Sequence, residues 1–208
     1  MSGRGVGPDT ERLMRARDVT GLPVVTIVGG DDIAEIRDVV YDAGSHSLIG
    51  FTLNKRGWFR GTLKGVLAAT DIEGIGADAV MVHDDAALTE SSTPVATLAD
   101  PETQRDVMGN RVLSSDGTDL GQITGVVLST GVDPAAVGYE LTDAAGEAMF
   151  VPISAQMAIS DTNLILPAES TEFVRNDLAG FGASIASYRA DLDRASEHVD
   201  PADHWEQP

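Results

Sequence analysis

The sequence predicts a mainly β protein, with two tandem small β-barrels followed by one C-terminal amphipathic α-helix. The chain carries one pattern twice, and each copy has short Val- and Ile-rich runs separated by Gly, Asp and Asn. Such runs are typical of strands joined by tight turns. Roughly four to six strands in about 70 residues favour a closed or nearly closed barrel, because closure removes exposed sheet edges. A helical apolar pattern follows the second copy.

Composition bounds the class of protein before any motif is considered. The 208 residues suffice for two small domains, and we expect residues 1–13 to form a flexible N-terminus. The chain has no cysteine, no signal-peptide pattern and no apolar run long enough to span a membrane, so we expect a cytoplasmic protein without a transmembrane segment. With 33 acidic and 14 basic residues, its net charge of −19 disfavours nucleic-acid binding and adsorption to anionic lipid.

The repeat fixes the expected domain boundaries. RDVTGLPVV at residues 17–25 returns as RDVMGNRVL at residues 105–113, an offset of 105 minus 17, or 88 positions. An Asp-Gly hairpin signal at residues 115–118 corresponds to Gly29-Gly30-Asp31-Asp32 in the first copy. We expect modules at residues 14–84 and 102–169, joined by a polar linker at residues 85–101.

These residues resemble the PRC-barrel family, the small β-barrel found in the photosynthetic reaction-centre H subunit and in the ribosome-maturation factor RimM. The second copy carries the resemblance through Gly109, Asp116-Gly117, Gly138 and Val151-Pro152-Ile153-Ser154. In the first copy, Leu67-Ala68-Ala69-Thr70 stands where the second copy has Val151-Pro152-Ile153-Ser154. The resemblance implies a barrel that presents one face to another macromolecule and has no catalytic residues.

Motifs for chemistry are weak in this sequence. None of the four histidines stands at ligand spacing from another histidine or in a recognisable metal motif, and His83-Asp84-Asp85 is read as the start of a solvated linker. No nucleophile elbow or phosphate-binding loop is present. We therefore expect no catalytic residues, no cofactor and no metal, and an enzyme would need a site built from scattered carboxylates.

A basic, aromatic loop at residues 54–64 is the first candidate contact surface. The corresponding residues of the second copy, 142–147, are acidic and lack aromatic side chains. Arg and Trp are enriched among interface hot spots, so the loop suits an acidic protein partner or an anionic head group. The alternative is that Lys55 and Arg56 neutralise acidic residues of a neighbouring barrel while Trp58 and Phe59 plug the barrel mouth. The candidate partner-binding residues are Lys55, Arg56, Trp58, Phe59, Arg60 and Lys64.

The C-terminal segment predicts an amphipathic helix over residues 170–199, with Ser170 and Thr171 as candidate caps and a flexible end at residues 200–208. Its apolar residues recur at steps of four and three, the average spacing of a heptad seam. The helix could pack on its own barrels or form a homodimer. The residues for either role are Val174, Leu178, Phe181, Ile185, Tyr188 and Leu192.

Together these features predict a non-catalytic cytoplasmic adaptor that binds another protein through a barrel face. A different class of function remains open, a small-ligand or metal-binding regulatory protein that uses the cleft between the two barrels.

Overall fold

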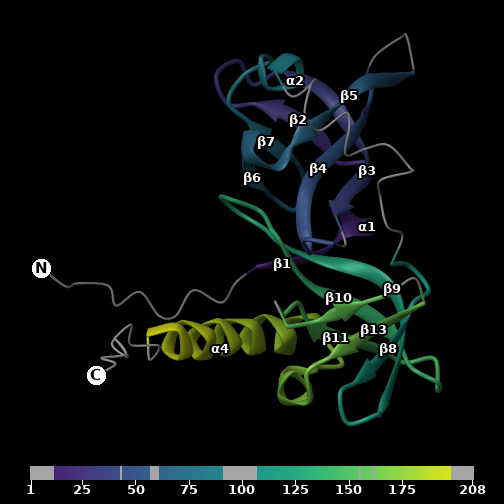
Figure 1. The fold of residues 1–208 in the computed structure, drawn as a ribbon. Coiled ribbons are helices and arrows are strands. Elements are labelled where there is room, and N and C mark those ends of the chain that lie inside the picture. The colour runs from purple at the N-terminus through teal and green to yellow at the C-terminus, as the bar shows by residue number, and fades with distance from the viewer. Residues whose placement is uncertain are drawn as a thin grey trace, which may run out of the picture.

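The computed structural model of the chain describes residues 12–42, 44–56, 61–90, 107–154, 156–160 and 162–197. Within these ranges the side chains of residues 62, 64, 65, 89, 90 and 189–197 are not described. The expected flexible termini and most of the expected linker fall outside these ranges. Figure 1 shows two β modules, with the single long helix beside the second.

The first module is a six-stranded sheet in the order β5-β4-β3-β2-β7-β6. All its neighbouring strands pair antiparallel except β2 and β7, which are parallel. Two one-turn helices and a 3-10 turn accompany it. Its elements are α1 (Ala16–Val19), β2 (Pro23–Thr26), β3 (Asp32–Asp42), β4 (Ser47–Asn54), β5 (Thr62–Ala68), η1 (Ala69–Asp71), β6 (Ile72–Ile75), β7 (Val80–Val82) and α2 (Ala87–Glu90).

The second module repeats this topology strand for strand, in the order β11-β10-β9-β8-β13-β12, with β8 and β13 as its parallel pair. Its elements are β8 (Arg111–Ser114), β9 (Asp119–Ser129), β10 (Ala136–Thr142), β11 (Ala148–Pro152), β12 (Ala158–Ile159) and β13 (Asn163–Leu166). Local hydrogen bonds repeat as well, because Gly21 N donates to Ile36 O and Gly109 N donates to Ile123 O, both at 2.8 Å. The mainly β fold and its internal repeat are confirmed.

The two modules share one apolar core. Ile36, Phe51 and Leu67 of the first module are fully buried. In the second module Tyr139 stands at the position of Phe51 and Val151 at that of Leu67, and both are also fully buried. All five belong to a single cluster that runs through both modules. Within the described residues no ladder joins β5 to β6 or β11 to β12, so each sheet is barrel-like without being closed by hydrogen bonds.

Strand β1 (Leu13–Arg15) departs from the expected boundary, because it precedes the first module in sequence and pairs with the second. It lies antiparallel to the C-terminal part of β9, beyond the reach of β8, with Met14 opposite Leu128. Thr130 N extends this pairing by donating to Arg12 O at 2.8 Å. The open edge of a long strand is thereby covered by a distant segment, which ties the two modules together.

Helix α4 (Leu178–Glu197) begins later than residue 170. Ser170 and Thr171 lie instead in the 3-10 segment η2 (Ala168–Phe173). The chain is then extended at Arg175, whose N–H donates to Phe150 O at 3.1 Å and whose carbonyl accepts from Phe150 N at 2.7 Å. The cap is Asp177, whose Oδ1 accepts from Gly180 N at 2.7 Å.

The first half of α4 packs on its own chain. Phe181 and Ile185 are buried in a second apolar cluster with three residues of the second module, and Phe181 stacks on Phe150 with ring centroids 5.8 Å apart. Tyr188 is buried beside Phe173, with centroids 4.9 Å apart. Val174 and Leu178 are half-buried, and the side chain of Leu192 lies outside the described part. Pairing of α4 with a second copy stays a prediction.

Among the described residues, none of the helices combines the length and apolar character needed to cross a membrane.

Candidate functional site

The basic loop predicted as a contact surface joins β4 to β5. Lys55 N donates to Gly61 O at 2.7 Å and closes the base of the loop. Lys55 and Arg56 are both exposed. The other four candidates are not placed, because Trp58, Phe59 and Arg60 lie outside the described residues and only the backbone of Lys64 is described, within β5.

Arg56 is held by carboxylates of its own module. Its guanidinium is ion-paired with Asp32, and its Nε lies 3.7 Å from Glu35 Oε2. The acid that it neutralises therefore belongs to the same barrel and not to the neighbouring one. All three side chains are more than a third exposed, so the pairs orient Arg56 more than they stabilise the fold.

Two exposed apolar residues lie in the turn that leads into β3. Ile27 is 54% exposed and Val28 is 70% exposed. Their N–H groups donate to Val82 O and His83 O at 2.8 and 3.1 Å, so the turn continues along β7. Asp32, the partner of Arg56, begins β3 directly after this turn. We call residues 27–31 and 54–64 together the loop end of the first module.

The second module supplies an internal comparison for this loop end. Its residues at the positions of Ile27 and Val28 are Ser115 and Asp116, and Ala144 stands at the position of Arg56. Hydrogen bonds from Ser114 and from the Thr118 backbone lower the pKa of Asp116. The equivalent connections therefore carry apolar and basic side chains in the first module, but polar and acidic ones in the second. Both connections are also longer in the first module, where Thr26 N donates to Asp31 O and Lys55 N to Gly61 O, against Ser114 N to Thr118 O and Asp143 N to Glu147 O.

Sequence reasoning missed Ile27 and Val28, because they extend the apolar run Pro23-Val24-Val25 and read as strand residues. The signal that could have identified them was the comparison of the two copies. The equivalent strands of the two copies should end at the same point, which places Ile27 and Val28 in a turn like Ser115 and Asp116. Apolar residues in one turn and polar residues in the other then indicate that the two modules differ in their exposed surface.

A buried carboxylate joins the N-terminal segment to the second module. Glu140 in β10 is 4% exposed. Its Oε1 accepts from Arg15 Nε at 3.0 Å and from Arg17 Nη2 at 3.2 Å, while Arg17 Nη1 lies 3.0 Å from Oε2 without hydrogen-bond alignment. The Arg15 guanidinium also lies 5.2 Å from the centroid of the Phe150 ring.

A second contact between the modules is aromatic and polar. Tyr41 Oη of the first module lies 2.5 Å from Tyr139 Oη of the second, and His46 Nδ1 lies 3.0 Å from the same Tyr139 hydroxyl. Burial raises the pKa of Tyr139 to about 12 and raises that of Tyr41 further. Burial also lowers the pKa of His46, against the opposing charge of Asp42. Burial therefore favours the neutral form of all three side chains.

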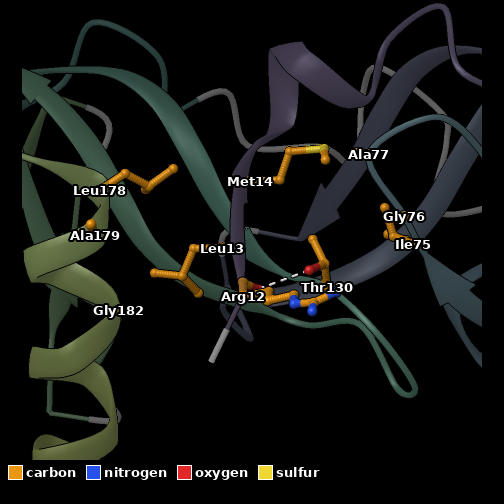
Figure 2. A pocket seen from close by; sticks show the side chains of 10 residues that line it. All are labelled: Arg12, Leu13, Met14, Ile75, Gly76, Ala77, Thr130, Leu178, Ala179 and Gly182. Carbon is orange, nitrogen blue, oxygen red and sulfur yellow. Dashed lines mark hydrogen bonds between the residues drawn. The ribbon is translucent and has the colours of Figure 1, made fainter. Parts of the chain in front are cut away.

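A pocket of about 660 Å³ lies where the two modules meet the start of α4 (Figure 2). Four parts of the chain line it: Arg12 with β1, the end of β6 with the turn after it, the loop after β9 and the first turns of α4. Its lining residues are Arg12, Leu13, Met14, Ile75, Gly76, Ala77, Thr130, Leu178, Ala179 and Gly182. It is the structural counterpart of the cleft expected between two barrels.

The described residues contain no group of three or more His, Cys, Asp or Glu side chains that could hold a metal ion. His83 and Asp85 are exposed, and Asp84 Oδ1 accepts from Ala86 N at 2.9 Å in a turn. The sequence interpretation of residues 83–85 as the start of a solvated linker is corrected in part, because the chain turns here into α2, whose Ala87 and Leu88 pack against the apolar core.

Comparison with protein families matches residues 11–91 to the PRC-barrel domain. None of the curated proteins searched shows a match to the chain. The matched segment contains every strand of the first module, from β2 to β7. The first module is therefore a PRC-barrel domain, and the second module repeats its strand order.

Proposed function

We propose that this chain is a non-catalytic cytoplasmic adaptor that binds another protein through the loop end of its first module. PRC-barrel domains are often found in protein interactions and are not catalytic. The observation that carries the proposal is the contrast between equivalent ends of the two modules, apolar and basic in the first and polar and acidic in the second. The cysteine-free sequence supports a reducing compartment.

The chemistry of the loop end defines the partner. Large exposed apolar side chains such as Val28 contribute contact area that is stabilising only when another surface covers them. Lys55, on a chain of net charge −19, adds a local positive charge that attracts an acidic surface. Arg56 is already oriented by Asp32 and Glu35, so less side-chain entropy is lost when it binds. The partner is therefore a protein face that combines carboxylates with an apolar patch.

The test compares substitutions at equivalent positions of the two modules. The intact protein, the double variant Lys55→Glu with Arg56→Ala, and the matched control Ala144→Glu in the second module serve as baits in affinity capture, followed by binding of the purified partner. The proposal expects the double variant to lose the partner and the control to keep it, with binding that weakens as salt rises. Equal binding by both variants, each shown to be folded by circular dichroism, would refute it.

A second candidate function is favoured by the pocket between the modules. Its size lies within the range of about 300–1,000 Å³ that is typical of small-ligand sites. A regulatory protein that binds a small ligand in this pocket is the corresponding function.

A further inference from the structure

We propose that the pocket at the junction of the two modules binds a small amphipathic anion, with Arg12 holding the anionic group and the apolar walls holding the rest. This inference rests on the second candidate function and is independent of the adaptor surface. It concerns the residues shown in Figure 2.

The walls of the pocket are suited to an apolar body. Leu13 and Met14 of β1, Leu178 of α4 and Ile75 of β6 supply the large side chains, and Figure 2 shows Leu13 and Leu178 extending into the space between β1 and α4. Glycine and alanine complete the walls and leave room between the larger groups. Removing an apolar chain from water against such walls is favourable by roughly 25 cal/mol per Å².

The charges at the pocket select an anion. The chain has 33 acidic residues, yet none of the ten lining residues is acidic and the single charged one is Arg12. Elsewhere in the described part, Arg15, Arg56 and Arg111 pair with carboxylates. Arg37 donates to the Thr52 hydroxyl, and Arg175 donates to backbone carbonyls. No carboxylate among the described residues pairs with Arg12. A ligand carboxylate would supply the missing charge.

The position of Arg12 is fixed while its side chain stays exposed. Its carbonyl accepts hydrogen bonds from Thr130 N at 2.8 Å and Thr130 Oγ1 at 2.9 Å. The second module thereby anchors the backbone of Arg12 at the edge of the pocket, from which its guanidinium can reach a bound anion. At the α4 side, Asp177 already occupies the helix N-terminus as its cap, so the anionic group belongs at Arg12 and the apolar chain extends towards Leu178.

The pocket takes its walls from both modules and from α4, so a bound ligand would stabilise their arrangement. Binding to the folded state alone raises the melting temperature as ligand concentration rises. This gives a readout that needs no protein partner.

The experiment compares decanoate with decanol, which has the same chain length without the charge, using calorimetry and thermal unfolding of the full chain below the micelle concentration. The variants are Arg12→Gln, the pocket-filling Ala179→Trp at an exposed position, and Lys55→Gln as the control on the loop end. We expect decanoate to bind the wild type and Lys55→Gln alike, Arg12→Gln to weaken decanoate by roughly tenfold to a hundredfold, and Ala179→Trp to abolish binding. The affinity for decanol should be the same in Arg12→Gln as in the wild type.

The inference is overturned if decanoate does not raise the melting temperature of the wild type, or if Arg12→Gln binds it equally well. Failure of the adaptor proposal would appear separately, as unchanged partner capture by the Lys55 and Arg56 variant.

Discussion

Replacing Phe181 with Ala should detach or loosen α4 from the second module. Phe181 is fully buried, lies in a small cluster with Ile185 and stacks on Phe150 at 5.8 Å. Removing a buried Phe costs about 3–5 kcal/mol when the site cannot collapse. We expect the free energy of unfolding to fall by about 3 kcal/mol, the low end, because a detached helix can relax the cavity.

The assay is urea unfolding followed by circular dichroism, with hydrogen exchange of the α4 amides and light scattering to monitor mass. The control is Ala183→Ser on the exposed side of the same helix, which should cost about 0.5 kcal/mol. A loss below about 1 kcal/mol for Phe181→Ala, with unchanged exchange in α4, would refute packing of the helix on its own module. A change from dimer to monomer would show instead that Phe181 packs against a second copy.

Gly138 beneath the ring gives an independent check of the same contact. A Cβ at this position would lie 2.5 Å from Phe181 Cζ and 2.6 Å from Val151 O. Gly138→Ala should therefore be destabilising by about 1–3 kcal/mol. In the Phe181→Ala background part of this cost should vanish, because one of the two clashes is gone, and additive effects would contradict the contact.

The remaining predictions concern the contacts between modules. Glu140→Gln should lower the free energy of unfolding by about 2 kcal/mol in urea titrations. Breaking a fully buried ion pair costs about 3–5 kcal/mol, and the cost is smaller here because the Arg17 side chain is 59% exposed. An unchanged free energy of unfolding would show that the ion pair does not stabilise the fold. Since the pKa of His46 is lowered in the folded state, unfolding takes up a proton and stability should decline as pH falls below about 6.5, a slope that His46→Gln should reduce. Since the pKa of Tyr139 is raised to about 12, stability should also decline as pH rises from about 10 towards 12, and Tyr139→Phe should flatten that limb if the cluster is as described.

The parts of the fold that follow local rules could be predicted from the sequence. Strand and turn chemistry acts over a few residues, so the Asp116-Gly117 signal placed a hairpin between β8 and β9, where Gly117 has φ 92°. The repeat then transferred the same topology to the first module. This is why the hairpin and the number of modules could be predicted without knowledge of long-range contacts. The strand order, with its parallel pair in each module, comes from the structure alone.

Pairing between segments that lie far apart in the chain could not be predicted from local sequence patterns. Nothing local to Leu13–Arg15 indicates that this segment covers an edge more than 100 residues away, on β9. The start of α4 was placed too early because Ser170 and Thr171 are good capping residues in isolation. Pairing of Arg175 with Phe150 holds the chain extended and leaves capping to Asp177.

The candidate site was only partly accessible from the sequence. The charge contrast between copies predicted Lys55 and Arg56 as contact residues, since it depends on composition alone, and their role in binding stays a prediction. Glu140 was overlooked, although an acidic residue within the apolar run of β10 is unusual and signals a buried pair. The cations that pair with it come from Arg15 and Arg17, more than 120 residues earlier in the chain.

Hydrogen exchange of the intact protein with and without its captured partner tests the central claim most directly. The account predicts protection concentrated at residues 27–31 and 54–64, with the equivalent residues 115–119 and 142–147 unchanged. Protection at the second module's end, with none at the loop end of the first, would contradict it.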